Sequence, residues 1–189
     1  MGLPLVTKAE YKAYMGISST NEDAKIDSLI PKVSALVKSL CNNSFNDYVN
    51  DAAVEVFEGG TSYYVPLEGP VLSIMSVEIS TDNGNTYTEL VEFTDFAYSK
   101  ATGLLRSIGR DFPILINGFK LTYTAGYEVI PADLKVAVLD LISYYMKNES
   151  AIHSNRAPGG NTVQIEYVLN TKLPAHISRI LDLYSNTYN

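Results

Sequence analysis

The sequence predicts an α+β fold, in which a mainly helical bundle packs on a small antiparallel β-structure. Apolar residues recur every three or four positions in residues 7–41 and again in residues 131–147, which is the spacing of a buried helix face. Between these stretches, residues 54–124 alternate apolar and polar positions, as half-buried strands do. We therefore expect two N-terminal helices, several short strands and one more core helix, followed by a C-terminal arm carrying a short helix.

The first helix is marked at both of its ends. Thr7 and Glu10 have the three-residue spacing of a capping box, in which each side chain accepts a hydrogen bond from the other residue's backbone N–H. Val6 and Tyr11 flank this box and can pack on one another. Gly16 predicts the end of the helix, because glycine readily takes the left-handed conformation found after a last turn.

A longer second helix is predicted up to about Cys41. Ser19 and Glu22 have the spacing of a second capping box, which would open this helix. Pro31 falls inside it and removes one backbone hydrogen bond, so we expect a kink near Asp27–Ile30 rather than two separate helices. The apolar positions expected to form one continuous face are Ile26, Leu29, Ile30, Val33, Leu36, Val37 and Leu40.

The strands are predicted to form an antiparallel sheet or a small barrel-like sandwich. Val71–Ile79 is the longest alternating stretch, and the turn Asp82–Asn85 contains the Asn-Gly pair that favours a type I′ hairpin. The same turn could be read as a calcium loop, but Phe93 stands where that loop needs an acidic residue. Two short segments are predicted from alternating positions, one at Val54 and Val56 and one at Tyr63 and Val65. The remaining predicted strands are Glu89–Phe93, Gly103–Arg106 and Phe119–Thr124.

The stretch Leu121–Lys135, which reads LTYTAGYEVIPADLK, joins the last of these strands to the third core helix. Pro131 suits the first turn of a helix because that position needs no N–H donor, and Asp133 there complements the helix dipole. A final strand ending in TYTAGY, followed by a hydrophobic-Pro-x-Asp-Leu-Lys helix start, resembles the head–tail connector (adaptor, or head-completion) proteins of tailed bacteriophages. The resemblance extends over roughly Leu3–Lys147 and marks a position in the fold rather than a catalytic site.

The resemblance implies a structural protein rather than an enzyme, with no cofactor. Connector proteins form a ring, commonly of twelve copies, beneath the portal after DNA packaging, and they bridge the portal to the next tail component. The implied partners are further copies of this chain, the portal protein and the next tail or head-completion component, while DNA passes through the lumen without specific binding. The implied location is the virion neck at the head–tail interface, after assembly in the host cytoplasm. Another virion ring or tail component with the same fold would share these features.

The chain extends past the part that resembles the connectors, so we expect a core domain over residues 1–147 and an assembly arm over residues 148–189. Residues 148–160 are rich in Ser, Asn, Gly and Pro, as linkers are. A possible strand and a short helix opened by Pro174 follow. The alternative is that this helix folds back on its own domain, because a helix of about eleven residues is marginal alone in water. The candidate portal or partner interface consists of Val163, Ile165, Tyr167, Ile177, Ile180, Leu181 and Tyr184.

Few residues offer catalytic or metal-binding chemistry. The two histidines, His153 and His176, have no metal-ligand spacing to each other or to a cysteine. The lone Cys41 cannot form an internal disulfide and lies in an apolar helical pattern, so we expect it to be buried. Gly59–Ser62 is glycine-rich but lacks the lysine of a phosphate-binding loop and predicts a turn.

One enzymatic alternative remains open at this stage. Glu55, Glu58 and Glu68 lie on or near predicted strands, and glycosidases act with a pair of carboxylates. The corresponding hypothesis is a peptidoglycan-degrading enzyme carried at the tail. Scattered carboxylates of an acidic chain are more often solvated surface groups.

The charge balance argues against tight binding to nucleic acid as a function. The net charge is −7, whereas phosphate binding calls for clustered basic residues. Arg106, Arg110 and Phe112 form one small basic–aromatic cluster, which is either a loop or a partner contact. No apolar run approaches the roughly 20 residues of a membrane span, and we expect no signal peptide in Met1–Lys8.

Overall fold

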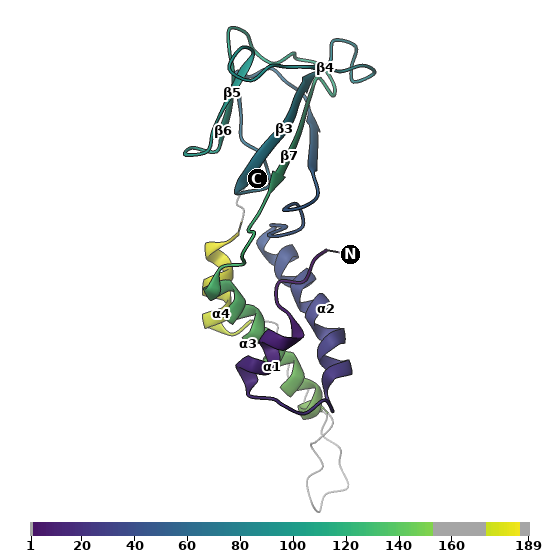
Figure 1. The fold of residues 1–189 in the computed structure, drawn as a ribbon, viewed down its shortest axis with the longest axis vertical. Coiled ribbons are helices and arrows are strands. Elements are labelled where there is room, and N and C mark those ends of the chain that lie inside the picture. Colours follow the sequence, from purple (N-terminus) through teal and green to yellow (C-terminus); the bar gives the residue numbers. More distant parts are fainter. Residues whose placement is uncertain (1, 153–172, 186–189) are drawn as a thin grey trace, which may run out of the picture. The chain divides into compact units, whose positions relative to one another are not determined.

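The computed structural model describes residues 2–152 and 173–185, with side chains described in residues 2–147 and 173–185. The described residues form two compact units. Residues 2–43, 130–152 and 173–185 form a helical unit, and residues 44–129 form a β unit (Figure 1). The predicted α+β class is confirmed. The helices are α1 (Lys8–Met15), α2 (Asp23–Cys41), α3 (Ala132–Ile152) and α4 (Ala175–Leu183).

Helix α1 has the predicted ends. The Thr7 side chain accepts from the Glu10 backbone N–H at 3.2 Å, and the Glu10 carboxylate accepts from the Thr7 N–H at 2.7 Å. Gly16 follows the helix with a φ of 66°. Val6 and Tyr11 are both buried. The capping box and the glycine stop are thus confirmed.

Helix α2 is a single helix through Pro31, as predicted, but the predicted second capping box is wrong. The helix begins at Asp23, and Glu22 makes no side-chain cap bond. The Ser19 hydroxyl accepts instead from the N–H of Asn21, only two residues on, so it closes a local turn before the helix starts. Its buried face consists of Ile26, Leu29, Ile30, Val33, Ser34, Val37 and Cys41, whereas Leu40 is exposed.

Helix α3 starts where the sequence predicts and ends later. The Pro131 carbonyl accepts from the N–H of Lys135 at 2.9 Å, which closes the first turn. The helix continues to Ile152, past the predicted end near Lys147, because residues 148–152 include no glycine or proline that would end it. Its buried side chains are Leu134, Ala137, Val138, Leu139, Leu141, Ile142 and Ser143.

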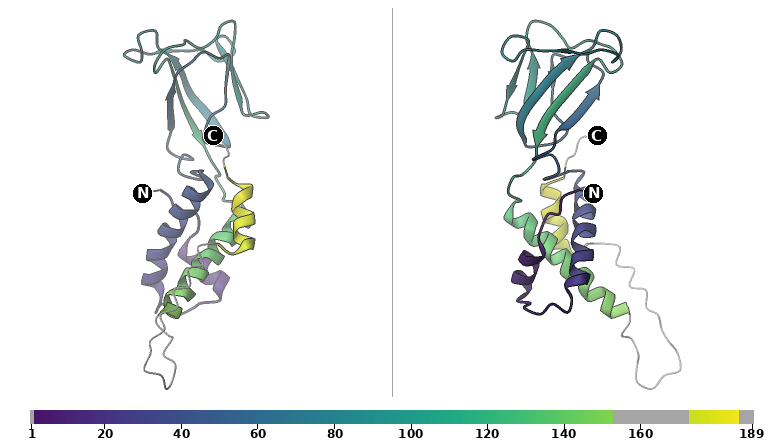
Figure 2. Two further views of the ribbon diagram at one scale, coloured as in Figure 1. Left: turned by 180° about the vertical axis from the view of Figure 1, so that it is seen from behind. Right: turned by 45° about the vertical axis from the view of Figure 1, so that its right-hand side comes forward.

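The β unit contains two antiparallel sheets, as Figure 2 shows. The larger sheet has the strand order β1-β7-β3-β4, and the smaller sheet has the order β2-β6-β5. The strands are β1 (Ala53–Phe57), β2 (Tyr63–Tyr64), β3 (Val71–Ile79), β4 (Thr88–Glu89), β5 (Phe96–Ser99), β6 (Leu104–Ser107) and β7 (Phe119–Ala125). The two sheets form an open sandwich and not a closed barrel.

Aromatic side chains from both sheets meet in the core of the sandwich. The Phe119 ring lies 4.4 Å from the Phe57 ring and 4.2 Å from the Phe112 ring, measured between centroids. The Phe57 and Tyr64 rings stack at 3.8 Å, which joins β1 to β2. Such pairs stabilise a core beyond the area that they bury. Leu105 of β6 is fully buried in the same cluster.

Two strand predictions needed correction. The predicted strand Glu89–Phe93 is limited to β4, because the Asp95 carboxylate accepts from the N–H of Val91 and turns the chain there. Strand β5 follows this turn and was not predicted, because its alternating pattern spans only four residues. Tyr63 and Tyr64 form a strand, but Val65 does not.

The turn after β3 has the predicted backbone conformation inside a longer loop. Asn83 and Gly84 have φ angles of 59° and 87°, and both must be positive in a type I′ turn. The Asp82 carboxylate accepts from the N–H and hydroxyl of Thr86 and from the hydroxyl of Ser80. These bonds lower the pKa of Asp82 to about 2. Asp82 therefore organises this loop through hydrogen bonds to its ionised carboxylate.

Gly126 fixes the exit of the chain from strand β7. Its φ is +112°, and a Cβ at this position would lie 2.0 Å from the carbonyl oxygen of Phe45. The two flanking residues hold the close approach, since the Ala125 N–H donates to the Tyr48 carbonyl and the Tyr127 N–H to the Phe45 carbonyl. Only glycine satisfies both the φ angle and the contact.

We predict that Gly126→Ala destabilises the protein by more than about 3 kcal/mol, because backbone strain and overpacking add at this position. Gly103→Ala is the matched control, since Gly103 has a φ of +66° with open space around it. The control should cost about 1 kcal/mol. Urea unfolding of both variants measures the difference, and equal losses would show that the Phe45 contact does not matter.

Candidate assembly surfaces

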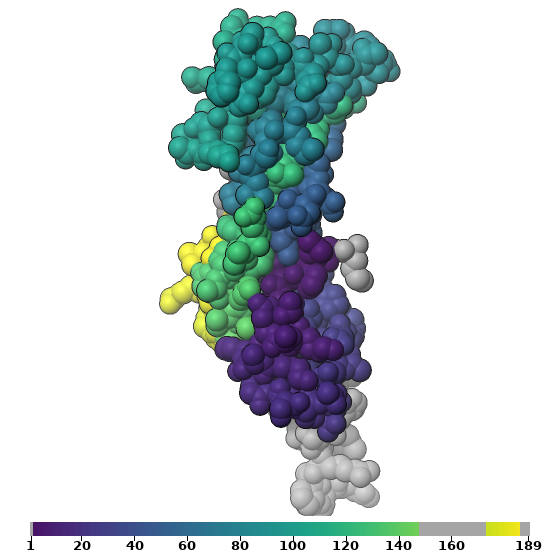
Figure 3. Space-filling view, viewed as in Figure 1, coloured from purple at the N-terminus to yellow at the C-terminus, as the bar shows by residue number. Residues whose placement is uncertain are grey.

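The predicted interface stripe on α4 is partly buried inside the helical unit. Ile177 and Leu181 are 1% and 4% exposed, and α4 packs on α2 and α3. The space-filling view shows α4 (yellow) lying directly against α3 (green) (Figure 3). Ile180 is half-buried. In this structure α4 therefore takes the alternative arrangement, folded back on its own domain, although the predicted boundary after residue 147 assigned it to the arm.

Polar contacts hold the C-terminal end of α4 in this position. The Tyr184 hydroxyl donates to the Asp133 carboxylate at 2.6 Å, and the Asn43 side-chain amide donates to the Tyr184 carbonyl at 3.3 Å. The hydrogen bond from Tyr184 lowers the pKa of Asp133. The Cys41 thiol lies 3.6 Å from the Leu181 carbonyl, and burial raises the pKa of this thiol to about 11. Cys41 is therefore a buried packing residue at neutral pH rather than a nucleophile.

The other predicted interface residues, Val163, Ile165 and Tyr167, lie outside the described residues. The contact of the whole stripe with a portal or another partner stays a prediction. Of the large apolar side chains in and just after α4, Leu183 is 73% exposed, and Ile180 and Tyr184 are half-buried. An amphipathic stripe in a sequence has the same spacing whether it contacts the chain's own core or a partner, so spacing alone did not separate these cases.

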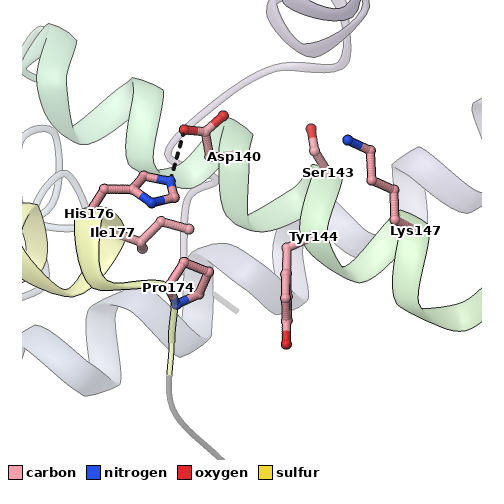
Figure 4. Close-up of a pocket in the computed structure, with 7 residues that line it drawn as sticks. All are labelled: Asp140, Ser143, Tyr144, Lys147, Pro174, His176 and Ile177. Atoms are coloured by element: carbon pink, nitrogen blue, oxygen red, sulfur yellow. Dashed lines mark ion pairs between the residues drawn. The ribbon is translucent and has the colours of Figure 1, made fainter. Parts of the chain in front are cut away.

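A shallow hollow of about 240 Å³ lies between α3 and α4 (Figure 4). It brings together Asp140, His176 and Ser143, the three residue types of a hydrolase triad. His176 Nε2 lies 3.5 Å from the Asp140 carboxylate. The Ser143 hydroxyl, however, donates to the Leu139 carbonyl at 2.9 Å and lies apart from His176 in Figure 4. The nucleophile–base hydrogen bond that a triad needs is therefore not formed.

The candidate glutamates of the enzymatic alternative have structural partners. The Glu55 carboxylate accepts from the hydroxyls of Tyr64, at 2.6 Å, and Tyr123, and from the N–H of Leu67 at 3.0 Å. Burial first, and Glu55 second, raise the pKa of both tyrosines, so their hydroxyls stay protonated as donors. Glu55 thus fastens the segment that follows β2 to β1 and β7.

Glu68 and Glu58 complete the set without forming a catalytic pair. The Glu68 carboxylate accepts from the hydroxyl of Ser44 at 2.8 Å and from its N–H at 3.3 Å. The Glu68 N–H donates to the Tyr123 hydroxyl at 2.9 Å, which links Glu68 to the Glu55 network. Glu58 is exposed and lies outside these bonds.

The structure separates the predicted basic–aromatic cluster. Phe112 is buried in the sandwich core, whereas Arg106 and Arg110 are exposed. Among the described residues, no group of three or more His, Cys, Asp or Glu side chains could hold a metal ion. In the same part of the chain, no helix is both long and apolar enough to span a membrane.

Acidic charge is concentrated in the β unit. Residues 44–129 contain twelve acidic and four basic side chains, a formal net charge of −8. The remaining residues contain nine acidic and ten basic side chains, a net charge of +1. A surface of this charge repels nucleic acid phosphate.

We predict that Leu181→Ala lowers the free energy of unfolding by about 2–4 kcal/mol, because Leu181 is buried against α2 and α3. Leu183→Ala, two residues on in the same helix, is the control and should change stability by less than about 0.5 kcal/mol. Chemical denaturation of the two variants tests the docking of α4. Equal, small effects would mean that α4 does not belong to the folded helical unit.

We predict that Glu55→Gln destabilises the β unit by about 1–3 kcal/mol, since one carboxylate oxygen that accepts from a buried hydroxyl becomes an NH₂ donor. Glu58→Gln should be neutral because Glu58 is exposed. Thermal unfolding measures the stability of both variants, and incubation of the wild-type protein with peptidoglycan tests the enzymatic alternative. If the wild type lyses peptidoglycan and Glu55→Gln loses this activity without losing stability, the result would support the peptidoglycan-degrading enzyme instead.

Comparison with known proteins places this architecture in a family. The sequence profile described as "Head completion protein" matches residues 4–187. The structure is similar to a chain in the "Neck of empty GTA particle computed with C6 symmetry", with a TM-score of 0.61, 14% identity and coverage of 100% of this chain and 91% of the other. It is also similar to one in the "Neck of native GTA particle computed with C12 symmetry", with a TM-score of 0.60, 14% identity and coverage of 96% and 88%.

No curated protein matches this chain. At 14% identity, the two solved structures show a shared fold. The family profile covers nearly the whole length of the sequence, including the stretch Leu121–Lys135 on which the resemblance to connector proteins was based. The chain belongs to the head completion protein family.

Proposed function

We propose that this chain is a structural protein of the neck of a tailed bacteriophage, where identical copies form a ring that joins the portal of the DNA-filled head to the tail. The observation that carries the proposal is the match of the head completion profile to residues 4–187. The fold it shares with chains from particle necks of C6 and C12 symmetry supports a ring, with twelve copies as the expected number.

The charge distribution supports a ring through which DNA passes without being held. A β unit of net charge −8 offers phosphate groups no clustered basic surface. Counted over the whole chain, twelve copies would carry a formal charge of about −84. The lumen is therefore expected to be acidic or neutral, with no salt-sensitive affinity for duplex DNA.

The described residues also support a role without catalysis. Of the three glutamates that could have formed a glycosidase pair, Glu55 and Glu68 accept structural hydrogen bonds and Glu58 is exposed. The hollow beside His176 lacks the bond between a nucleophile and its base. Among the described residues, these candidate catalytic groups are occupied by structural contacts or left exposed, which supports a role in assembly.

The portal contact is proposed to involve the segment between α3 and α4, where Val163, Ile165 and Tyr167 alternate in the sequence. An extended segment of this pattern can add to the edge of a partner's sheet. The exposed side of α4, with Leu183, would extend that surface. This assignment replaces an arm that includes all of α4, because Ile177 and Leu181 are already buried.

The test is to replace Val163, Ile165 and Tyr167 together by serine in the full chain and to supply the variant to a phage lacking the gene. Electron microscopy of the lysate should show DNA-filled heads without tails, while the purified variant melts within about 2 °C of the wild type. Leu183→Ser serves as the matched variant on α4. Normal numbers of tailed particles would remove the segment from the portal contact, and tailed particles in the absence of the gene would overturn the proposed function itself.

A further inference from the structure

The β unit carries two exposed apolar features formed by different parts of its sandwich. In the strand orders β1-β7-β3-β4 and β2-β6-β5, strands β1 and β4 are the edges of the larger sheet, and β2 and β5 are the edges of the smaller one. The first feature lies against both the loop from β1 to β2 and the turn from β3 to β4. The second lies between β3 and the segment from β4 to β5.

The first feature is the isoleucine loop, which we define as residues 113–118. Ile114 and Ile116 in this loop are 80% and 63% exposed. A single exposed isoleucine is ordinary, but two in one short loop form a projecting apolar surface. Sequence reasoning missed this loop, although an apolar run between Pro113 and Gly118 with no strand to pair with was the available signal.

The isoleucine loop is held firmly by its neighbours. The Gly60 N–H donates to the Phe112 carbonyl at 2.8 Å, and the Phe112 N–H donates to the Thr61 carbonyl at 3.1 Å. From the other side, the Tyr87 hydroxyl donates to the Asn117 carbonyl at 3.0 Å. A Cβ on Gly59 would lie 2.1 Å from the Pro113 carbonyl, so the two loops are in direct contact. A loop fixed in this way loses little conformational entropy on binding.

The second feature is the edge groove, a cleft of about 460 Å³ beside β3. Its apolar walls include Ile74, Met75, Val91 and Phe96. Met75 is 58% exposed and falls at a shift in the pairing register between β3 and β7, a kind of irregularity that re-aims side chains.

The edge of β3 at this groove is also open. Strand β4 pairs with β3 at Glu78 and Ile79, and the Leu90 N–H also donates to the Val77 carbonyl at 2.7 Å. Within the described residues, the part of β3 before Val77 has no strand on this side. An open edge next to an apolar cleft is a surface that a partner can cover.

The charges around the two features favour a second copy of this chain as the occupant. Glu89 and Glu92 line the edge groove and are exposed. Arg106 and Arg110, two of the four basic residues of the β unit, lie in β6 and just before the isoleucine loop. Asp111 follows Arg110 in sequence and cancels its charge in the local sum. The complementarity therefore rests on the pairing of individual side chains and not on the net charge of the loop.

We propose that the isoleucine loop of one copy binds in the edge groove of the next, with Arg110 of the first copy beside Glu92 of the second. Because the two surfaces differ and are formed by different residues, each copy uses one toward each neighbour. A contact of this head-to-tail kind closes into a ring when the rotation from one copy to the next is a full turn divided by a whole number. The inference rests on the proposed ring and names the surfaces that join its subunits.

Cysteine cross-linking tests the contact directly. Ile114→Cys and Met75→Cys are prepared as separate full-length variants, mixed at high concentration and oxidised, while the native Cys41 stays buried. The mixture should form a disulfide-linked dimer that neither variant forms alone, and the double variant should form a ladder of dimers, trimers and larger species. The control pairs Ile114→Cys with Val129→Cys, an apolar residue 78% exposed outside the groove.

A charge exchange gives a second and independent measurement. Arg110→Glu and Glu92→Arg should each weaken self-association by about fivefold in sedimentation equilibrium, and the double variant should recover it. Glu58→Arg, combined with Arg110→Glu, is the control that should give no recovery.

The outcomes separate this inference from the proposed function. Efficient dimers of Ile114→Cys alone would indicate a symmetric contact and overturn the head-to-tail pairing. Electron microscopy could show rings while the Ile114→Cys and Met75→Cys mixture forms no more disulfide-linked dimer than the control mixture. That result would support the ring and overturn this contact. Failure to self-associate under any condition, with or without portal protein, would count against the ring as well.

Discussion

Strand β7 is the constraint on which the β unit depends. It pairs along its length with β1 on one side and β3 on the other, and it is the last strand of the unit to be synthesised. Its inward-facing residues Phe119, Leu121 and Tyr123 are fully buried. Strands β1 and β3 do not pair with each other, and only β7 joins them. The larger sheet can therefore be completed only after β7 has taken its place between them. Such non-local pairing favours slow, cooperative folding.

The parts of the fold that follow from local chemistry were predictable. The capping box of α1, the start of α3 at Pro131 and the boundaries of β3 each depend on residues within a few positions of one another. The capping prediction failed at Ser19 because its hydroxyl found a nearer N–H, which spacing alone does not reveal. Strand β5 was missed because its four residues become a strand only by pairing with β6.

The candidate surfaces were harder to predict, for a physical reason. An apolar position on α4 reads the same whether its partner is α3 or another protein, and only the three-dimensional contacts place Leu181 inside and Leu183 outside. Glu55 likewise looks like any strand carboxylate until Tyr64 and Tyr123 are brought to it from 9 and 68 residues away. Side chains whose role depends on distant neighbours carry no local signature.

The uneven division of charge has a consequence for when copies can come together. In a ring of the proposed kind, adjacent β units would bring like-charged surfaces close together, and their repulsion is felt over about one Debye length, or ~8 Å at physiological ionic strength. Counterions must collect between the units before they can touch, so association grows easier as salt rises. The nearly neutral helical unit bears no such penalty. We therefore expect a chain built this way to resist self-assembly in dilute solution and to depend on a template or on cations to begin it.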